Sequence, residues 1–422
     1  MIGFTRTARL NTFLAVCFLL LLPGGDIEAC TSFIISGRYT PDGRPVLYKN
    51  RDTDNMNNAL VYFSDGRYDY IGLVNSDSTW KSMVWGGYNS AGFAIINTAA
   101  YNNNTGDTTK ISDLEGVLMK KALQNCRTLA DFEVLLDTIK KPAGVDANFG
   151  VIDAQGGAAY YETGNFRYVK FDANDPAVAP DGFLVRTNHS VSGDYSKGLG
   201  HVRFNTATAA LRNAFRDKKL SPEELKNCIS RNLSNSLTGD DLSADIPAGD
   251  KPRYRFFLDF IPRRSTSGVI MIVGAKDEKD IPNAMMWTIL GFPPVSIAIP
   301  VWISAGEHLP AAVSMKDDLH APVCDAALKL KDDCFPLRTD GGQNYINVTA
   351  VINRRKTGYM QLLKPYEETI FKKAADIEKG LEEGTKSKQD VINFYGWVDE
   401  YVAGGFEKTG KVEMFYPANA KK

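Results

Sequence analysis

The sequence predicts an α+β protein built from antiparallel sheets with helices packed on their faces. Three observations support this fold class. Blocks of strand-forming residues alternate along the chain with blocks of helical periodicity. Short turn sequences join the strands within a block, which favours antiparallel pairing. Residues 357–403 are charged and helical in pattern, so we expect residues 351–422 to form a helical C-terminal extension packed on the same domain.

The first strands are predicted to form a hairpin. Residues 31–36 are largely apolar and β-branched, Pro41-Asp42-Gly43 is a turn signal, and residues 46–48 form the return strand. Cys30 is therefore expected at the start of the strand that opens the hairpin. Residues 83–85 and 92–98 are the next predicted strands, with the turn 89–92 between them.

The middle of the chain alternates between helices and strands. Apolar spacing predicts helices over 113–124, 129–139 and 202–215. Thr128 followed by Asp131 predicts a capped start for the second helix, and Ser221-Pro222-Glu223-Glu224 predicts the start of a fourth. The remaining predicted strands cover residues 149–153, 158–162, 182–187, 268–273, 284–290 and 295–303.

The first 29 residues have the layout of a secretory signal peptide. Arg6 and Arg9 supply the positive start, an apolar run covers residues 13–22, and the small residue Ala29 precedes Cys30. The apolar run is far shorter than the ~20 residues that a membrane-spanning helix needs. We therefore expect an exported protein, periplasmic or secreted, without a stable membrane span.

Charge and composition exclude several classes of partner and cofactor. The formal net charge of -1 argues against a nucleic-acid partner. The four histidines show no metal-ligand spacing, and no nucleotide-binding motif is present, so neither a metal nor a cofactor is expected. Cys126, Cys228, Cys324 and Cys334 form an even set that allows three disulfide pairings, one of them joining the last two across a loop. The alternative is a set of buried free thiols.

Cys30 has the chemistry of a self-contained nucleophile once the signal is removed. A new N-terminal α-amine has a pKa of about 7.7–8.0, so part of it is neutral near pH 7. It can take the thiol proton directly or through one water, and no histidine is needed. The mature N-terminus would then carry both the nucleophile and its base.

The segment 50–54 ends the predicted hairpin and should return near Cys30. An arginine there, such as Arg51, would favour the thiolate, and a carboxylate could orient the α-amine. The alternative for this segment is a surface turn with a solvated ion pair.

These residues resemble the opening of the cysteine N-terminal-nucleophile (Ntn) hydrolases. That group includes choloylglycine hydrolases, penicillin V acylases, acyltransferases of the 6-aminopenicillanic acid type and related cysteine dipeptidases. Its Cys-Thr start is matched by Cys30-Thr31, and its Arg-x-x-Asp pair by Arg51 and Asp54. The resemblance further implies that Asn97 and Asn188, each in a segment similar to a family strand, are oxyanion-hole residues, and that Arg203 is an active-site arginine.

The resemblance implies a four-layer αββα sandwich over residues 30–350 and an amidase that cleaves linear C–N bonds through an acyl thioester on Cys30. The same nucleophile would serve an acyltransferase or a dipeptidase. Bile-salt amides, penicillins, acylated amino acids and dipeptides all remain open as the small-molecule amide substrate. A different class of protein, a non-catalytic lipoprotein lipidated at Cys30, is the competing hypothesis, although Glu28 makes a poor lipidation signal. Asn188 also heads a glycosylation sequon, and we expect it to be buried and unmodified.

Overall fold

The structure is a computed structural model that describes residues 29–109, 112–315 and 320–414. The predicted signal peptide lies outside the described residues except for Ala29. No helix among the residues described is both long and apolar enough to cross a bilayer.

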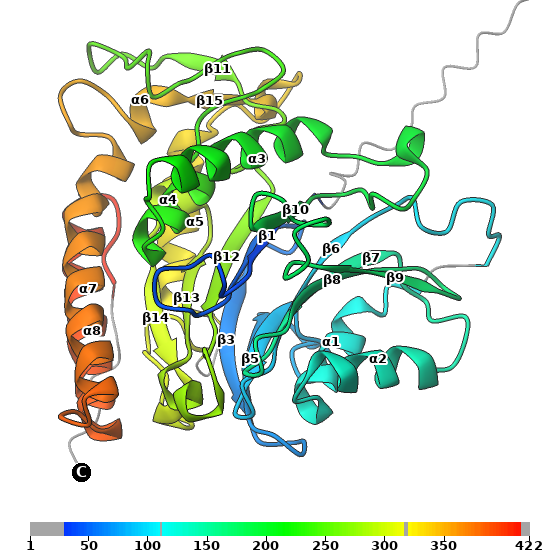
Figure 1. Ribbon diagram of the computed structural model, residues 1–422. Coiled ribbons are helices and arrows are strands. Elements are labelled where there is room, and N and C mark those ends of the chain that lie inside the picture. The colour runs from blue at the N-terminus through cyan, green and yellow to red at the C-terminus, as the bar shows by residue number, and fades with distance from the viewer. Residues whose placement is uncertain (1–28, 110–111, 316–319, 415–422) are drawn as a thin grey trace, which may run out of the picture.

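Two antiparallel sheets form the centre of the molecule (Figure 1). The six-stranded sheet has the order β10-β1-β2-β12-β13-β14, and the seven-stranded sheet runs from β3 to β9 in sequence order. The strands of the first sheet are β1 (Thr31–Ile35), β2 (Val46–Asp52), β10 (Phe183–Arg186), β12 (Thr266–Val273), β13 (Met285–Leu290) and β14 (Ile299–Trp302). Those of the second are β3 (Asn58–Phe63), β4 (Tyr70–Asn75), β5 (Gly86–Asn89), β6 (Ala94–Ala99), β7 (Ala147–Ile152), β8 (Ala158–Thr163) and β9 (Tyr168–Asp172).

Side chains from the two sheets meet face to face. Ser32 Oγ on β1 lies 2.7 Å from the Tyr160 hydroxyl on β8. The Lys49 ammonium on β2 reaches Asn97 on β6. Because successive residues of a strand point to opposite faces, Leu47, Lys49 and Arg51 face the second sheet, while Tyr48, Asn50 and Asp52 face the helices behind the first.

Helices cover the outer face of each sheet, which completes four layers (Figure 1). Helices α1 (Glu115–Asn125) and α2 (Leu129–Thr138) lie on the seven-stranded sheet, where Phe132 packs edge-on against Phe149 and Tyr161. Helices α3 (His201–Arg216), α4 (Pro222–Ser230) and α5 (Pro322–Cys334) lie on the six-stranded sheet. The predicted α+β class and four-layer αββα sandwich are confirmed.

The C-terminal helices α7 (Tyr359–Glu382) and α8 (Lys388–Glu407) pack on the same layered fold, after a short α6 (Val348–Val351). Phe371 of α7 stacks on Trp287 of β13 with 3.7 Å between ring centroids. The Tyr395 hydroxyl of α8 accepts a hydrogen bond from the backbone of Trp302 at 2.7 Å. Glu367 of α7 forms a buried ion pair with Lys226 of α4. A small separate ribbon pairs β11 (Tyr254–Phe256) with β15 (Tyr345–Asn347).

Several elements differ from the sequence prediction. The strand expected over 83–85 is β5 at Gly86–Asn89, a segment whose glycines lack strand propensity. Tertiary packing requires them, since a Cβ on Gly87 would lie 2.2 Å from the Ile71 carbonyl oxygen. Strands β3, β4, β9, β11 and β15 and helix α5 were not predicted, and the late strand expected over 295–303 is shorter.

The cysteines outside the hairpin are free thiols. Cys126, Cys228, Cys324 and Cys334 form no disulfide in the structure, and this holds for every cysteine it describes. A loop-spanning pair of the last two is excluded because both lie on α5. Ten residues at about 1.5 Å rise separate them by roughly 15 Å, well beyond disulfide reach.

Candidate functional site

Cys30 lies at the start of β1 and is buried, with 7% of its surface exposed. The hairpin register pairs Thr31 with Asn50, so the end of β2 runs alongside Cys30 as the sequence predicted. The thiol points at the backbone carbonyl of Asp52, with 4.0 Å from Sγ to oxygen. Strand pairing thus brings the cysteine and the charged segment 50–54 together.

Arg203, in the first turn of α3, is the residue that ties the Cys30 backbone to the rest of the site. Its Nη1 donates to the carbonyl oxygens of Ala29 at 3.0 Å and Cys30 at 2.6 Å, and to the Thr31 hydroxyl at 2.9 Å. Its Nη2 donates to Asn188 Oδ1 at 2.8 Å. Burial lowers the pKa of Arg203 to about 10, with the Asp52 carboxylate opposing the shift, so the guanidinium is charged at neutral pH.

Asn188 follows β10 and is fully buried, as expected from the sequence. Its side-chain oxygen faces Arg203, and its amide nitrogen donates to the Ala99 carbonyl at 2.9 Å, at the end of β6. The side chain therefore links α3 with the seven-stranded sheet next to Cys30. Its burial agrees with the expectation that it stays unmodified.

Three side chains from the second sheet and its loops hold the segment that carries Asn188. Glu162 accepts from Arg186 Nε at 2.7 Å and from the backbone nitrogens of Val191 and Ser192 at 2.8 and 2.7 Å. Asn148 and Asn102 bind further groups of this segment, including the carbonyls of His189 and Ser190. Sequence reasoning identified neither asparagine, because each bond joins residues far apart along the chain.

Replacing Glu162 with glutamine should destabilise the fold strongly. The substitution leaves the buried Arg186 without its carboxylate, and breaking a buried pair costs roughly 3–5 kcal/mol. Urea unfolding measures the loss. Glu133→Gln is the control, because Glu133 pairs with Lys170 in a partly exposed position and should change stability by about 1 kcal/mol or less. If Glu162→Gln lowered the free energy of unfolding by less than about 1 kcal/mol, other contacts would hold the Asn188 segment.

Asn97 lies on β6 and faces the first sheet, where its Oδ1 accepts from Lys49 Nζ at 2.5 Å. Lys49 also donates to the Trp85 carbonyl at 2.8 Å and is buried between the sheets. The sequence prediction did not include Lys49. A signal was present, however, because a basic residue precedes an aspartate by three positions twice in this segment, as Lys49…Asp52 and as Arg51…Asp54.

Asp52, and not Asp54, is the carboxylate that the structure brings into the site. Asp54 is exposed in the loop after β2. Asp52 is buried, accepts from Thr266 Oγ1 at 2.6 Å and from Asn50 Nδ2 at 2.8 Å, and lies 3.9 Å from Arg263 Nε. Burial raises the pKa of Asp52 to about 6, against the lowering effect of the charges of Arg263 and Arg203.

Arg51 lies on the opposite face of β2 from Asp52. Its guanidinium stacks over the Trp85 ring, 4.7 Å from the centroid, and donates to Asn58 Oδ1. Continuing the pairing of Thr31 with Asn50 by one residue sets Cys30 opposite Arg51. Of the six predicted site residues, Arg51, Arg203 and Asn188 thus gather at Cys30, directly or through one another. Asn97 is linked to the neighbouring strand β2 through Lys49, and Asp54 lies apart in the exposed loop.

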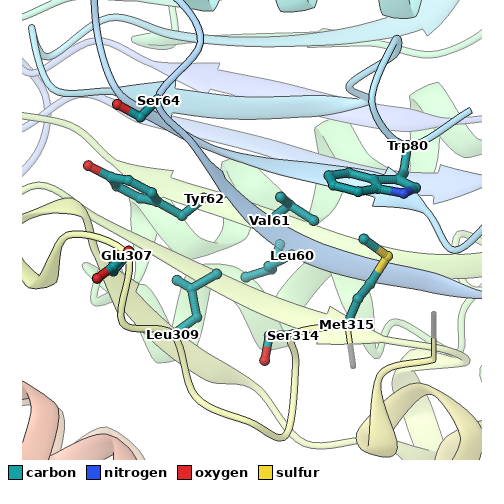
Figure 2. A pocket seen from close by; sticks show the side chains of 9 residues that line it. All are labelled: Leu60, Val61, Tyr62, Ser64, Trp80, Glu307, Leu309, Ser314 and Met315. Carbon is teal, nitrogen blue, oxygen red and sulfur yellow. The ribbon is translucent and has the colours of Figure 1, made fainter. Parts of the chain in front are cut away.

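A groove of about 570 Å³ follows the edge strand β3 (Figure 2). This strand begins at Asn58, whose side-chain oxygen accepts a hydrogen bond from Arg51. Leu60, Val61, Leu309, Trp80 and Met315 make much of the lining apolar. Trp80 and Met315 lie at one end, while Tyr62, Ser64 and Glu307 lie at the other (Figure 2). Sequence reasoning identified none of these residues.

The structural neighbours of this chain are N-terminal-nucleophile hydrolases. They include an N-acylethanolamine-hydrolyzing acid amidase ortholog of Caenorhabditis elegans, with 15% identity over 58% of this chain and 92% of that one and a TM-score of 0.38. Penicillin V acylase from Agrobacterium tumefaciens has 15% identity over 65% of this chain and 86% of its own, with a TM-score of 0.38. Conjugated bile acid hydrolase from Clostridium perfringens has 12% identity over 65% and 92%, with a TM-score of 0.39.

Neither a protein-family model nor a curated protein sequence matches the chain.

Proposed function

We propose that this protein is an exported amidase that cleaves a linear C–N amide bond with Cys30 as its nucleophile. One observation carries the proposal. The buried start of β1 is surrounded by polar groups from separate segments of the chain: the Asp52 backbone carbonyl beside the thiol, the Arg203–Asn188 pair on the backbone, and Asn97 held by Lys49 on the neighbouring strand. Buried polar groups that converge on a thiol are typical of nucleophilic catalysis.

The chemistry begins with removal of the residues before Cys30. The freed α-amine takes the thiol proton, and the sulfur attacks the carbonyl carbon of the substrate amide. Asn97 and Asn188 stabilise the tetrahedral oxyanion, and losing one such donor typically costs ~100–1000-fold in rate. The α-ammonium then returns the proton to the leaving amine as the C–N bond breaks. Water attacks the resulting thioester, which releases the carboxylic acid and regenerates the thiol.

Asp52 and Arg203 have separate roles in this scheme. The Asp52 carboxylate, on the strand alongside Cys30, holds the α-ammonium in place. Arg203 keeps its bonds to the Cys30 carbonyl and the Thr31 hydroxyl after cleavage and so fixes the new N-terminus. Its bond to the Ala29 carbonyl is lost at that step.

The bond ahead of Cys30 is enclosed in the folded chain. Ala29 is 4% exposed, and its carbonyl oxygen is bonded to Arg203. A signal peptidase needs an accessible, extended segment, so we infer that it acts before the site closes around Ala29. The predicted signal peptide and a periplasmic or secreted location form part of this proposal.

Mass spectrometry of the exported protein tests the proposal at its first step. We expect a chain that begins at Cys30 with a free α-amine. The same sample, assayed with a conjugated bile salt, penicillin V, an N-acyl amino acid and a dipeptide, should hydrolyse at least one of the four. A lipidated or blocked Cys30, or a first residue elsewhere, would contradict the proposal and favour a non-catalytic surface protein.

A further inference from the structure

We propose that Lys49 is a positioning residue that orients the amide of Asn97 so that nitrogen, and not oxygen, is presented to the reacting carbonyl. This inference rests on the proposed function of Cys30 and Asn97. It concerns a residue whose cation is buried between the two sheets and bonded to the neutral side chain of Asn97.

The geometry leaves Asn97 one orientation. An ammonium group has three donors and no acceptor, so only the oxygen of the Asn97 amide can bind it. Nζ lies 2.5 Å from Oδ1, and its second bond, 2.8 Å to the Trp85 carbonyl, anchors the lysine to the segment before β5. Because oxygen and nitrogen lie on opposite sides of the amide carbon, binding Oδ1 directs Nδ2 away from Lys49.

The energetics favour a strong orienting effect. A hydrogen bond to a charged donor is stronger than one between neutral groups, and a buried environment strengthens it further. Without the ammonium, the amide of Asn97 can turn about its terminal torsion, which has a broad, roughly two-fold profile. The turned amide would present a lone pair to the developing oxyanion, which removes the stabilisation and replaces it with repulsion.

The bonds of Lys49 to Asn97 and Trp85 differ in kind from the bond of the buried lysine of α4. The buried lysine of α4, Lys226, is bonded to the carboxylate of Glu367, as is usual for a buried cation. Lys49 donates to an amide oxygen and to a backbone carbonyl oxygen, across the gap between β2 and the second sheet. Its side chain is thus placed to act on Asn97.

A double-mutant cycle on the chain beginning at Cys30 tests the inference, with p-nitrophenyl acetate as the probe because an activated ester needs no knowledge of the natural amide. We expect Lys49→Met and Asn97→Ala each to lower kcat about 100–1000-fold with KM nearly unchanged. The double variant should be no more than about tenfold slower than Asn97→Ala, because the two substitutions remove one interaction. Lys49→Arg, which keeps N–H donors, should retain at least a tenfold advantage over Lys49→Met.

Two further variants separate orientation from folding. Asn97→Asp can still accept from Lys49 but cannot donate, so it should be as slow as Asn97→Ala. Lys226→Met removes a buried lysine away from the site and should lower the unfolding midpoint while kcat stays within about threefold of the parent protein.

The results that would contradict this inference are different from those that would contradict the proposed function. If Cys30→Ala still reacts with the probe as the parent does, the proposed nucleophile is wrong. If Cys30→Ala is inactive but Lys49→Met keeps its kcat, or if the effects of Lys49→Met and Asn97→Ala multiply in the double variant, Lys49 does not act through Asn97. A Lys49→Arg variant that is as slow as Lys49→Met would overturn the inference as well.

Discussion

Replacing Cys30 with alanine should abolish amide hydrolysis and leave the fold intact. The thiol is the only group in the scheme that forms a bond to substrate, and knocking out a nucleophile of this kind costs on the order of 10⁶-fold in kcat. The effect on folding should be small, since the contact from Sγ to the Asp52 carbonyl is long at 4.0 Å. Single-turnover assays with the panel of amides, together with thermal unfolding, measure both quantities.

Cys334→Ala is the matched control for this variant. Cys334 is also buried, and its thiol donates to the Leu330 carbonyl within α5. Its loss creates a small cavity and should cost about 1 kcal/mol of stability without changing kcat. Amide turnover that survives Cys30→Ala, or disappears in Cys334→Ala while the protein stays folded, would reject Cys30 as the nucleophile.

Replacing Asp52 with asparagine should slow catalysis at least about 100-fold and stabilise the uncleaved chain at neutral pH. Burial raises the pKa of Asp52 to about 6, above the ordinary aspartate value of about 3.9. Between those two pH values the folded chain holds a proton that the unfolded chain has released, so stability falls as pH rises through this window. At pH 7 the buried charge therefore costs about 3 kcal/mol, a cost that asparagine does not carry.

The same substitution separates stability from function. Urea unfolding at pH 4 and pH 7 should show that Asp52→Asn gains stability only at the higher pH. The gain should be smaller in the chain that begins at Cys30, because the new α-ammonium offsets the carboxylate. Activity should fall at least about 100-fold, since the α-amine loses the group that holds it.

Asp54→Asn provides the control, because it alters the second aspartate of the segment, which belongs to the Arg-x-x-Asp pair, at an exposed position. We expect neither the stability nor the activity to change. A loss of activity in Asp54→Asn with full activity in Asp52→Asn would restore the pairing of Arg51 with Asp54 that the sequence resemblance implies.

Local signals predicted much of the fold. The capping boxes at Thr128–Asp131 and Ser221–Glu224 form as expected, because each involves residues three apart. The hairpin of β1 and β2 was predicted from its turn for the same reason. The strand β5 was displaced in the prediction because its glycines are selected by the close approach of β4 and not by their own propensity.

The sequence by itself determined that Cys30 opens a hairpin and that the second strand of this hairpin brings the charged segment 50–54 back alongside Cys30. A turn and two short strands are enough to specify this pairing of β1 with β2. The sequence did not determine which basic residue and which aspartate of the segment reach the site, because the spacing of three occurs twice within residues 49–54. Only the tertiary structure decided this. The alternation of β2 turns Lys49 toward Asn97 on the opposing sheet and buries Asp52 beside Thr266, whereas Asp54 lies beyond the end of the strand and faces solvent.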